Sequence, residues 1–179
     1  MQLQNTNTRY GLIAILFHWV MALLIIGLLI LGWVMVRLPI GLEKLRFFGW
    51  HKEYGLLVLL LAILRIAWRL SQVVPILPAH LAHWEKWAAH AVHYLFYIFM
   101  FLMPISGWLI TSATGLPASF FGIVVFPDLV APNEQLRQWF IWIHQWSGYG
   151  LVVIILLHIS AALQHHFIYK DDILRRMFP

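Results

Sequence analysis

Residues 11–36 read GLIAILFHWVMALLIIGLLILGWVMV, and no Asp, Glu, Lys or Arg lies between Arg9 and Arg37. A helix needs about 20 apolar residues to cross a lipid bilayer, so this run is long enough. The apolar part of a secretory signal covers only about 7–15 residues, and this longer run also contains His18. We therefore expect residues 11–36 to form a membrane-spanning helix.

The composition of the whole chain indicates a lipid environment. Of its 179 residues, 62% are hydrophobic and 11% are charged, whereas soluble domains carry about 25% charged residues. The net charge of +5 does not indicate nucleic-acid binding, because the cations stand singly at the ends of apolar runs. We expect membrane lipids as partners and no nucleic acid. The oligomeric state stays open.

Three further helices are expected in the remaining apolar runs, at about residues 50–70, 87–112 and 138–168. The second is the least apolar, because Lys52, Glu53 and Arg65 interrupt it. The segment from Gly115 to Pro127 is expected to form a loop at the membrane surface. These elements predict an all-α fold, a transmembrane four-helix bundle in which residues 1–179 form one domain.

The placement of Trp, Lys and Arg predicts the topology. The ten Trp residues lie mostly near the ends of the predicted helices, as in the aromatic belts of membrane proteins. With four spans both termini lie on one side, and that side carries seven cations against five on the other. Since cytoplasmic loops are rich in Lys and Arg, we expect the termini in the cytoplasm.

The chain contains no Cys but has ten His residues. The lack of thiols excludes iron–sulfur clusters, thiolate zinc sites and covalent c-type haem, which needs Cys-x-x-Cys-His. Any metal chemistry must therefore use imidazole.

Four histidines can be assigned to two depths. His144 and His158 lie 14 residues apart, close to four helical turns, so they share one helix face about 21 Å apart. His51 lies near the outer end of its helix and is the expected partner of His144. His18 lies about two turns in from the inner side and is the expected partner of His158. Ionisable groups within a membrane are costly and usually mark function, so two pairs at matched depths predict two iron sites.

Small residues share the helix face of each of these histidines. They are Gly11, Gly55, Gly148, Ala161 and Ala162. Small side chains would let a broad planar group such as haem approach the helix backbone. Haem also carries two propionates, for which Arg9 and Arg65 are the inner candidates. The outer candidates are Lys44, Arg46, Lys52 and Arg137.

The other histidines keep alternative roles. His90 and His93 lie near the inner surface and could replace His158 as a ligand, or serve a quinone or protons. His165 and His166 lie at the inner interface and could donate hydrogen bonds and protons to a quinone. A histidine in a span can also be a hydrogen-bonded packing residue.

Two more histidines, His80 and His83, are expected in a loop. Met100 and Met103 could serve as axial ligands, although filling gaps in the core is favoured.

Several short motifs resemble bacterial cytochrome b561 proteins in order and spacing. They are Arg9-Tyr10-Gly11 leading to Phe17-His18-Trp19, Trp50-His51-Lys52, His90-Ala91-Val92-His93, Pro104-Ile105-Ser106-Gly107 and His165-His166-Phe167. The resemblance covers almost the whole chain and implies a four-helix protein of the bacterial inner membrane with two b haems. Its implied iron ligands are His18, His51, His144 and His158. Some family members act as superoxide oxidases, which pass electrons from periplasmic superoxide to ubiquinone.

The leading functional hypothesis is electron transfer through two b haems between a periplasmic donor, with superoxide as the candidate, and the ubiquinone pool. The outer cations would attract the superoxide anion. An alternative is a haem-bearing membrane anchor that exchanges electrons with a partner oxidoreductase, although the short loops offer little docking surface. A third reading, a histidine-based transporter, is disfavoured because broken helices and repeated halves are not evident.

Overall fold

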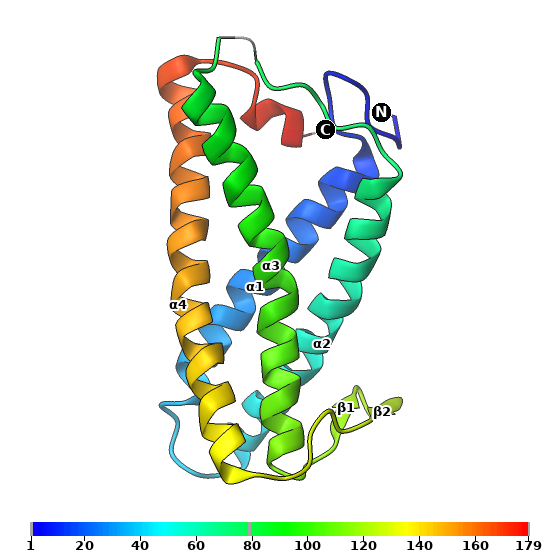
Figure 1. Ribbon diagram of the computed structural model, residues 1–179, viewed down its shortest axis with the longest axis vertical. Helices are drawn as coiled ribbons and strands as arrows, with labels where there is room; N and C mark the ends of the chain where they lie inside the picture. The colour runs from blue at the N-terminus through cyan, green and yellow to red at the C-terminus, as the bar shows by residue number, and fades with distance from the viewer. Residues whose placement is uncertain (1, 79, 179) are drawn as a thin grey trace.

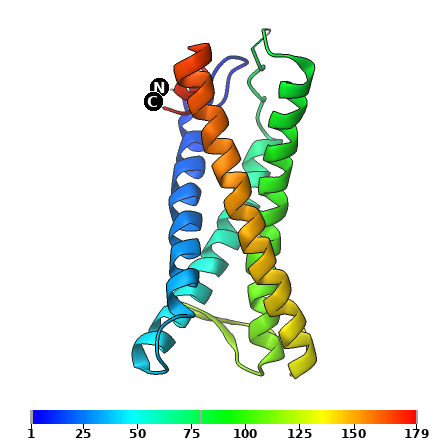
Figure 2. The same ribbon diagram turned by 90° about the vertical axis from the view of Figure 1, so that its left-hand side faces the viewer.

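Four long helices form the computed structural model, which describes residues 2–78 and 80–178. They are α1 (Leu12–Met35), α2 (Leu42–Leu70), α3 (His83–Ala113) and α4 (Glu134–Gln164). A one-turn π-helix, η1 (His165–Tyr169), extends α4, and a short 3₁₀-helix, η2 (Leu174–Met177), precedes the C-terminus. The helices run side by side along the long axis, and both termini lie at the same end (Figures 1 and 2). The predicted all-α four-helix bundle is confirmed.

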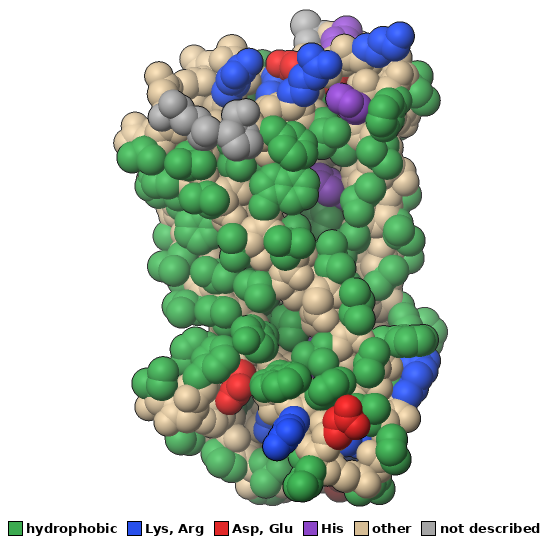
Figure 3. All heavy atoms as spheres, turned by 180° about the vertical axis from the view of Figure 1, so that it is seen from behind, with side chains coloured by type: hydrophobic (Ala, Val, Ile, Leu, Met, Phe, Trp, Pro, Cys, Tyr) green, Lys and Arg blue, Asp and Glu red, His purple; other side chains and the backbone are tan. Residues whose placement is uncertain are grey.

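Three of the described helices are long and apolar enough to cross a membrane: α1, α3, and α4 together with η1. Most of their side chains are not buried against the rest of the protein, so the apolar surface faces outward, toward lipid. Figure 3 shows this surface as a hydrophobic belt, with charged side chains gathered at its two ends. α2, which contains Lys52, Glu53, Arg65 and Arg69, is not among these three helices. The protein is therefore a multi-pass membrane protein.

Three helices, α2, α3 and α4, begin earlier than the apolar runs predict, because polar first turns extend them. α2 starts at Leu42, and Glu43 in its first turn complements the helix dipole. α3 starts at His83, where the Glu85 side chain accepts a 2.8 Å hydrogen bond from the Ala82 amide. α4 starts at Glu134, capped by Asn133. His83, expected in a loop, is thus the first residue of α3.

A β-hairpin occupies the segment that was expected to form an irregular loop. β1 (Ala118–Phe120) pairs antiparallel with β2 (Val124–Phe126). The turn places Gly122 at φ 69°, a conformation that glycine adopts without strain. The hairpin is anchored to α3 by Trp108, whose Nε1 donates to the Pro127 carbonyl at 3.1 Å. Alternation over three residues was too short to reveal these strands from the sequence.

The helices do not pack equally against one another. Among the described residues, close backbone packing joins α3 to α4, α1 to α2 and α2 to α3, whereas α4 has no comparable packing against α1 or α2. A buried cluster of Met21, Val58, Ala62 and Met100 fills the centre between α1, α2 and α3. Met100 thus fills the core, as favoured above. The spaces between α4 and the helices α1 and α2 are therefore not filled by close helix packing.

Candidate functional site

His51 on α2 and His144 on α4 face each other across the bundle. Their ring centroids lie 6.0 Å apart. Both line a cavity of about 190 Å³ that is otherwise mostly apolar. α2 and α4 do not pack closely, so the two imidazoles meet over a gap between helices. The predicted partnership of these two histidines agrees with their placement.

A serine on α3 orients the His144 ring. The Ser106 hydroxyl donates its proton to the Met103 carbonyl at 2.9 Å and lies 2.8 Å from Nδ1 of His144. A hydroxyl has one proton, so toward His144 it acts as an acceptor and Nδ1 carries the hydrogen. The lone pair of the neutral ring is then on Nε2, which leaves that nitrogen ready to bind a metal.

Glycines from neighbouring helices lie against the two rings. A Cβ added at Gly32 on α1 would lie 3.2 Å from Cε1 of His51, and one at Gly107 on α3 would lie 3.5 Å from Cε1 of His144. The predicted Gly55 lines the cavity, and a Cβ there would meet no atom within 4 Å. The space beside the rings is thus cleared mainly across helix interfaces, which the same-helix spacing did not reveal.

The other two predicted glycines have different neighbours. A Cβ on Gly148 would contact Cε of Met103 at 3.7 Å, and one on Gly11 would collide with the backbone of Leu3 and Gln4. Gly11 therefore allows the N-terminal segment to approach α1 closely.

Three histidines converge nearer the end that carries the termini. The ring centroid of His158 on α4 lies 6.1 Å from that of His18 on α1 and 5.9 Å from that of His93 on α3. Arg65 on α2 is close enough to act electrostatically on all three rings. His93 therefore lies beside His158, and both His93 and His90 are exposed on the surface of α3.

The spacing within the pairs matches the requirement for two imidazoles on one iron. A metal–nitrogen bond of about 2 Å on each side, plus the distance from nitrogen to ring centre, sets the centroids about 6 Å apart. Among the described residues, no group of three or more His, Cys, Asp or Glu could chelate a bare ion. Paired imidazoles in apolar surroundings suit a flat macrocycle that supplies the remaining ligands itself. The buried Nδ1 of His51 has no partner in the described structure.

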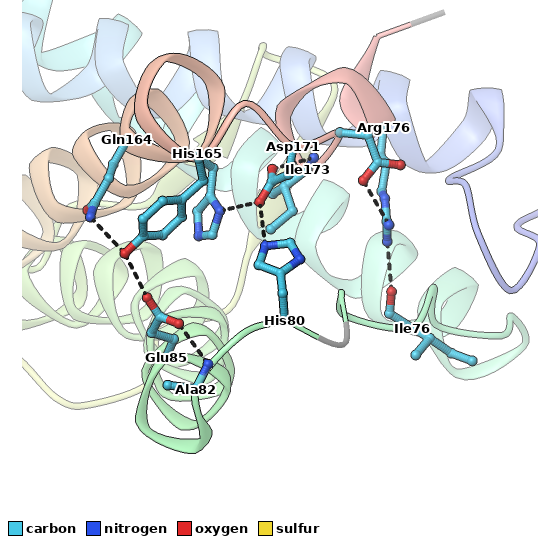
Figure 4. Close-up of polar contacts among 11 residues, drawn as sticks. Ile76, His80, Ala82, Glu85, Gln164, His165, Asp171, Ile173 and Arg176 are labelled. Carbon is cyan, nitrogen blue, oxygen red and sulfur yellow. Dashed lines mark hydrogen bonds and ion pairs between the residues drawn. The ribbon is translucent and has the colours of Figure 1, made fainter.

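The remaining predicted inner histidines, His165 and His166, lie in η1, and Figure 4 shows the contacts of His165. Asp171 accepts from Nδ1 of His165 at 2.7 Å and lies 3.3 Å from Nε2 of His80. Burial alone would raise the pKa of Asp171, but these contacts and the Ile173 amide outweigh it and lower the pKa below its usual value. Nδ1 of His166 is buried without a partner in the described structure.

The outer cations differ in availability. Lys44 donates to the carbonyls of Val36 and Leu38 at the end of α1, and Arg137 pairs with Glu134 at 2.6 Å. Lys52 lines the cavity beside His51, and Arg46 is exposed. Lys44 and Arg137 stabilise helix ends. Of the four predicted outer cations, Lys52 and Arg46 therefore remain available to attract an anion.

A sequence profile described as prokaryotic cytochrome b561 matches residues 9–179. The chain belongs to this family. The resemblance to cytochrome b561 proteins that the motifs indicated is thereby confirmed. Proteins of this family bind b-type haem, so the chain is a membrane haem protein of electron transport.

Relatives with curated names support the same assignment. The chain is 35% identical to "Cytochrome b561 homolog 2" of Escherichia coli strain K12 over 184 residues, covering 99% of this chain and 95% of that protein. It is 27% identical to "Probable superoxide oxidase CybB" of Yersinia pestis, covering 97% of each. A shorter match, 37% identical and covering 43% of each chain, is to "Cytochrome b561 homolog 1" of E. coli K12.

Proposed function

We propose that this cytochrome b561 protein holds two b haems and carries electrons from periplasmic superoxide to ubiquinone in the bacterial inner membrane, with its termini in the cytoplasm. The observation that carries the proposal is the pair of imidazole spacings, 6.0 Å between His51 and His144 and 6.1 Å between His18 and His158. Both pairs use α4, at two levels of one lipid-facing bundle.

Each histidine pair would hold one haem. His51 and His144 bind the outer group, and His18 and His158 bind the inner one, with His93 as the competing partner of His158. When bound, haem supplies one-electron exchange. The protein would contribute imidazole nitrogens, the hydrogen bond from His144 to Ser106 and an apolar cavity, and these features would set the reduction potential.

Two cations are placed to meet the haem propionates. Arg65 lies close to the three inner rings, and Lys52 lines the outer cavity. Each would offset carboxylate charge at the edge of its pocket. Arg9, the other inner candidate, lines a different cavity formed by the chain ends.

Superoxide is the proposed donor. Two superoxide anions would each give up one electron and leave as dioxygen, and ubiquinone would take two electrons and two protons to become ubiquinol. Lys52 and Arg46 would attract the anion locally. The similarity to a protein named as a superoxide oxidase supports this choice of substrate.

A quinone site near the termini would use His165 and His166. Asp171 accepts from Nδ1 of His165, so Nε2 of the neutral ring carries the lone pair and would accept a hydrogen bond from a quinol hydroxyl. The unpartnered Nδ1 of buried His166 offers a second polar atom. Replacing both with alanine should slow quinone reduction while haem content and superoxide-driven haem reduction persist. An unchanged rate of quinone reduction would remove this site.

Haem content of the purified protein tests the central claim. Pyridine haemochrome measurement should give two b haems per chain for the wild type and one for His144→Ala or for His18→Ala. His93→Ala should keep two. Loss of haem from His93→Ala with retention in His18→Ala would reassign the inner ligand, and a wild-type protein without haem would overturn the proposal.

A further inference from the structure

A second cavity lies at the end of the bundle where the two chain termini meet. Its volume is about 290 Å³, and its lining includes Gln2, Gln4, Arg9, Tyr10, Arg176 and Phe178. We propose that this cavity binds the phosphate group of an anionic phospholipid headgroup. This site goes beyond the proposed electron-transfer function and uses none of the histidines.

The charge of the cavity favours an anion. Two arginines line it, and none of its lining residues in the described part of the chain is a carboxylate. Arg176 pairs with Asp172 at 2.9 Å and donates from Nη1 to the Ile76 carbonyl at 2.7 Å, yet its Nε is buried without a partner in the described structure. Arg9 forms no ion pair within the described residues. An anion in the cavity would offset the positive charge of the two arginines.

Tyr10 adds a neutral donor to the same cavity. Burial raises the pKa of its hydroxyl, while Arg69, Arg176 and Arg65 act in the opposite direction. The net upward shift keeps the phenol protonated at neutral pH, so its O–H can donate to an anion. The three arginines also show that positive charge from α2 and from the C-terminal segment gathers around this residue.

The cavity walls are fixed by contacts between distant parts of the chain. The Leu12 amide donates to the Gln2 carbonyl at 3.0 Å, and the Ile76 amide donates to the Asn7 carbonyl at 2.9 Å. From the other terminus, the Met177 carbonyl accepts from Nε1 of Trp19 at 2.7 Å. Both ends are therefore attached to the bundle, and the cavity does not lie between loose tails.

The location of the cavity fits a lipid headgroup. It lies where the two termini meet, at one end of the bundle (Figure 1). Figure 3 shows charged side chains gathered at that end, beyond the hydrophobic belt. Ile15 and Phe178 give it an apolar side, which can face the glycerol and upper acyl carbons while the arginines contact the phosphate. Free phosphate has the same charged group but no use for the apolar side.

Lipid retention by the purified haem-loaded protein tests this proposal. The protein is first placed in nanodiscs of phosphatidylcholine, with or without phosphatidylglycerol, and is then released into detergent. Native mass spectrometry measures which lipid remains bound to it. The wild type should retain phosphatidylglycerol in preference to phosphatidylcholine. Arg9→Gln should lower that retention about tenfold or more, because it removes a charge-assisted contact. Arg175→Gln, an exposed cation on η2 outside the cavity lining, should retain the lipid.

Further measurements separate the possible outcomes. Tyr10→Phe should also weaken retention, which keeps the test open if Arg9→Gln folds poorly. Thermal stabilisation by inorganic phosphate that Arg9→Gln abolishes, without any preference for phosphatidylglycerol, would support the phosphate site but assign it to free phosphate. Equal lipid retention by the wild type, Arg9→Gln and Tyr10→Phe would overturn the proposal. Loss of one haem from Arg9→Gln would overturn it too, by assigning Arg9 to a propionate.

Discussion

Ser106 acts on a proposed iron ligand through a single hydrogen bond, which makes it the sharpest test at the scale of one residue. An acceptor at Nδ1 makes the imidazole a stronger electron donor and favours oxidised iron. Ser106→Ala should therefore raise the reduction potential of the outer haem and leave the inner one unchanged in a potentiometric titration. Ser112→Ala, a buried serine on the same helix that instead accepts from Leu129, should change neither potential. Equal shifts in both variants would contradict the assigned role.

Gly32 tests the close approach of α1 to His51. The 3.2 Å separation that a Cβ would have from Cε1 is too short for ordinary contact, so Gly32→Ala should displace the ring and lower haem content toward one per chain. Gly27→Ala on the same helix meets nothing within 4 Å and should keep both haems. Its added methyl should also favour the helix slightly. Full haem content in Gly32→Ala would contradict this geometry.

Single residues differ in how far the sequence predicts them. Depth along each helix was enough to pair His51 with His144 and His18 with His158. Ser106, Gly32 and Gly107 were missed because each lies on a different helix from the ring that it contacts. Such contacts depend on how each helix is rotated about its axis, and that rotation is not encoded in spacing along one helix.

At the scale of elements, the segment after α4 is held by Asp171. Its side chain is 9% exposed and contacts His165 and His80, which joins η1 to the connection between α2 and α3. Asp171→Asn should loosen this junction, at a cost of about 1–3 kcal/mol for a lost charged hydrogen bond. Faster hydrogen exchange in η1 at neutral pH would report the change. Glu43→Gln, at the opposite end of the bundle, should leave that exchange unaffected.

Acidification should loosen the same junction in the wild type. The pKa of Asp171 is lower in the folded protein than its usual value, so its contribution to stability is complete above about pH 4. That contribution is lost as the pH falls through the folded-state pKa. Exchange in η1 should therefore accelerate below about pH 4 in the wild type, with a smaller pH response in Asp171→Asn. Parallel responses would show that other groups control the segment.

The elements were predictable where hydrophobicity alone defined them. The apolar run at residues 11–36 located α1 to within a residue at each end. α2 was placed eight residues late, because its first turns hold the charges Glu43, Lys44 and Arg46. These side chains reach the polar interface or cap α1, so they lengthen the helix without making the sequence more apolar. The hairpin and the π-helix depend on tertiary contacts and leave no such pattern.

At the scale of the whole molecule, charge should control the encounter with superoxide. Lys52 and Arg46 are the outer cations left available, and a local field of this kind weakens as salt screens it. Haem reduction by superoxide should slow at high salt, and Arg46→Gln should slow it at low salt. Lys44→Gln should have little effect on this rate, because Lys44 serves the end of α1. Absence of reduction at either salt concentration would remove superoxide as the donor.

The global properties followed from composition. A charged fraction of 11% required lipid around the bundle, and the outward-facing apolar surface of the helices agrees with it. The uneven packing of α4 could not be foreseen, since it depends on which helix faces leave room for other groups. The predicted cytoplasmic side of the termini rests on a difference of seven cations to five and stays a prediction.

The isolation of α4 from α1 and α2 has a consequence for biogenesis. A newly inserted chain can dock α4 on α3 alone, and under the proposed function the haems between the facing imidazoles would then join α4 to α1 and α2. Cells starved of haem should then accumulate a half-closed species that membrane proteases recognise. The supply of the pigment, more than transcription of the gene, would set how much mature protein the membrane contains.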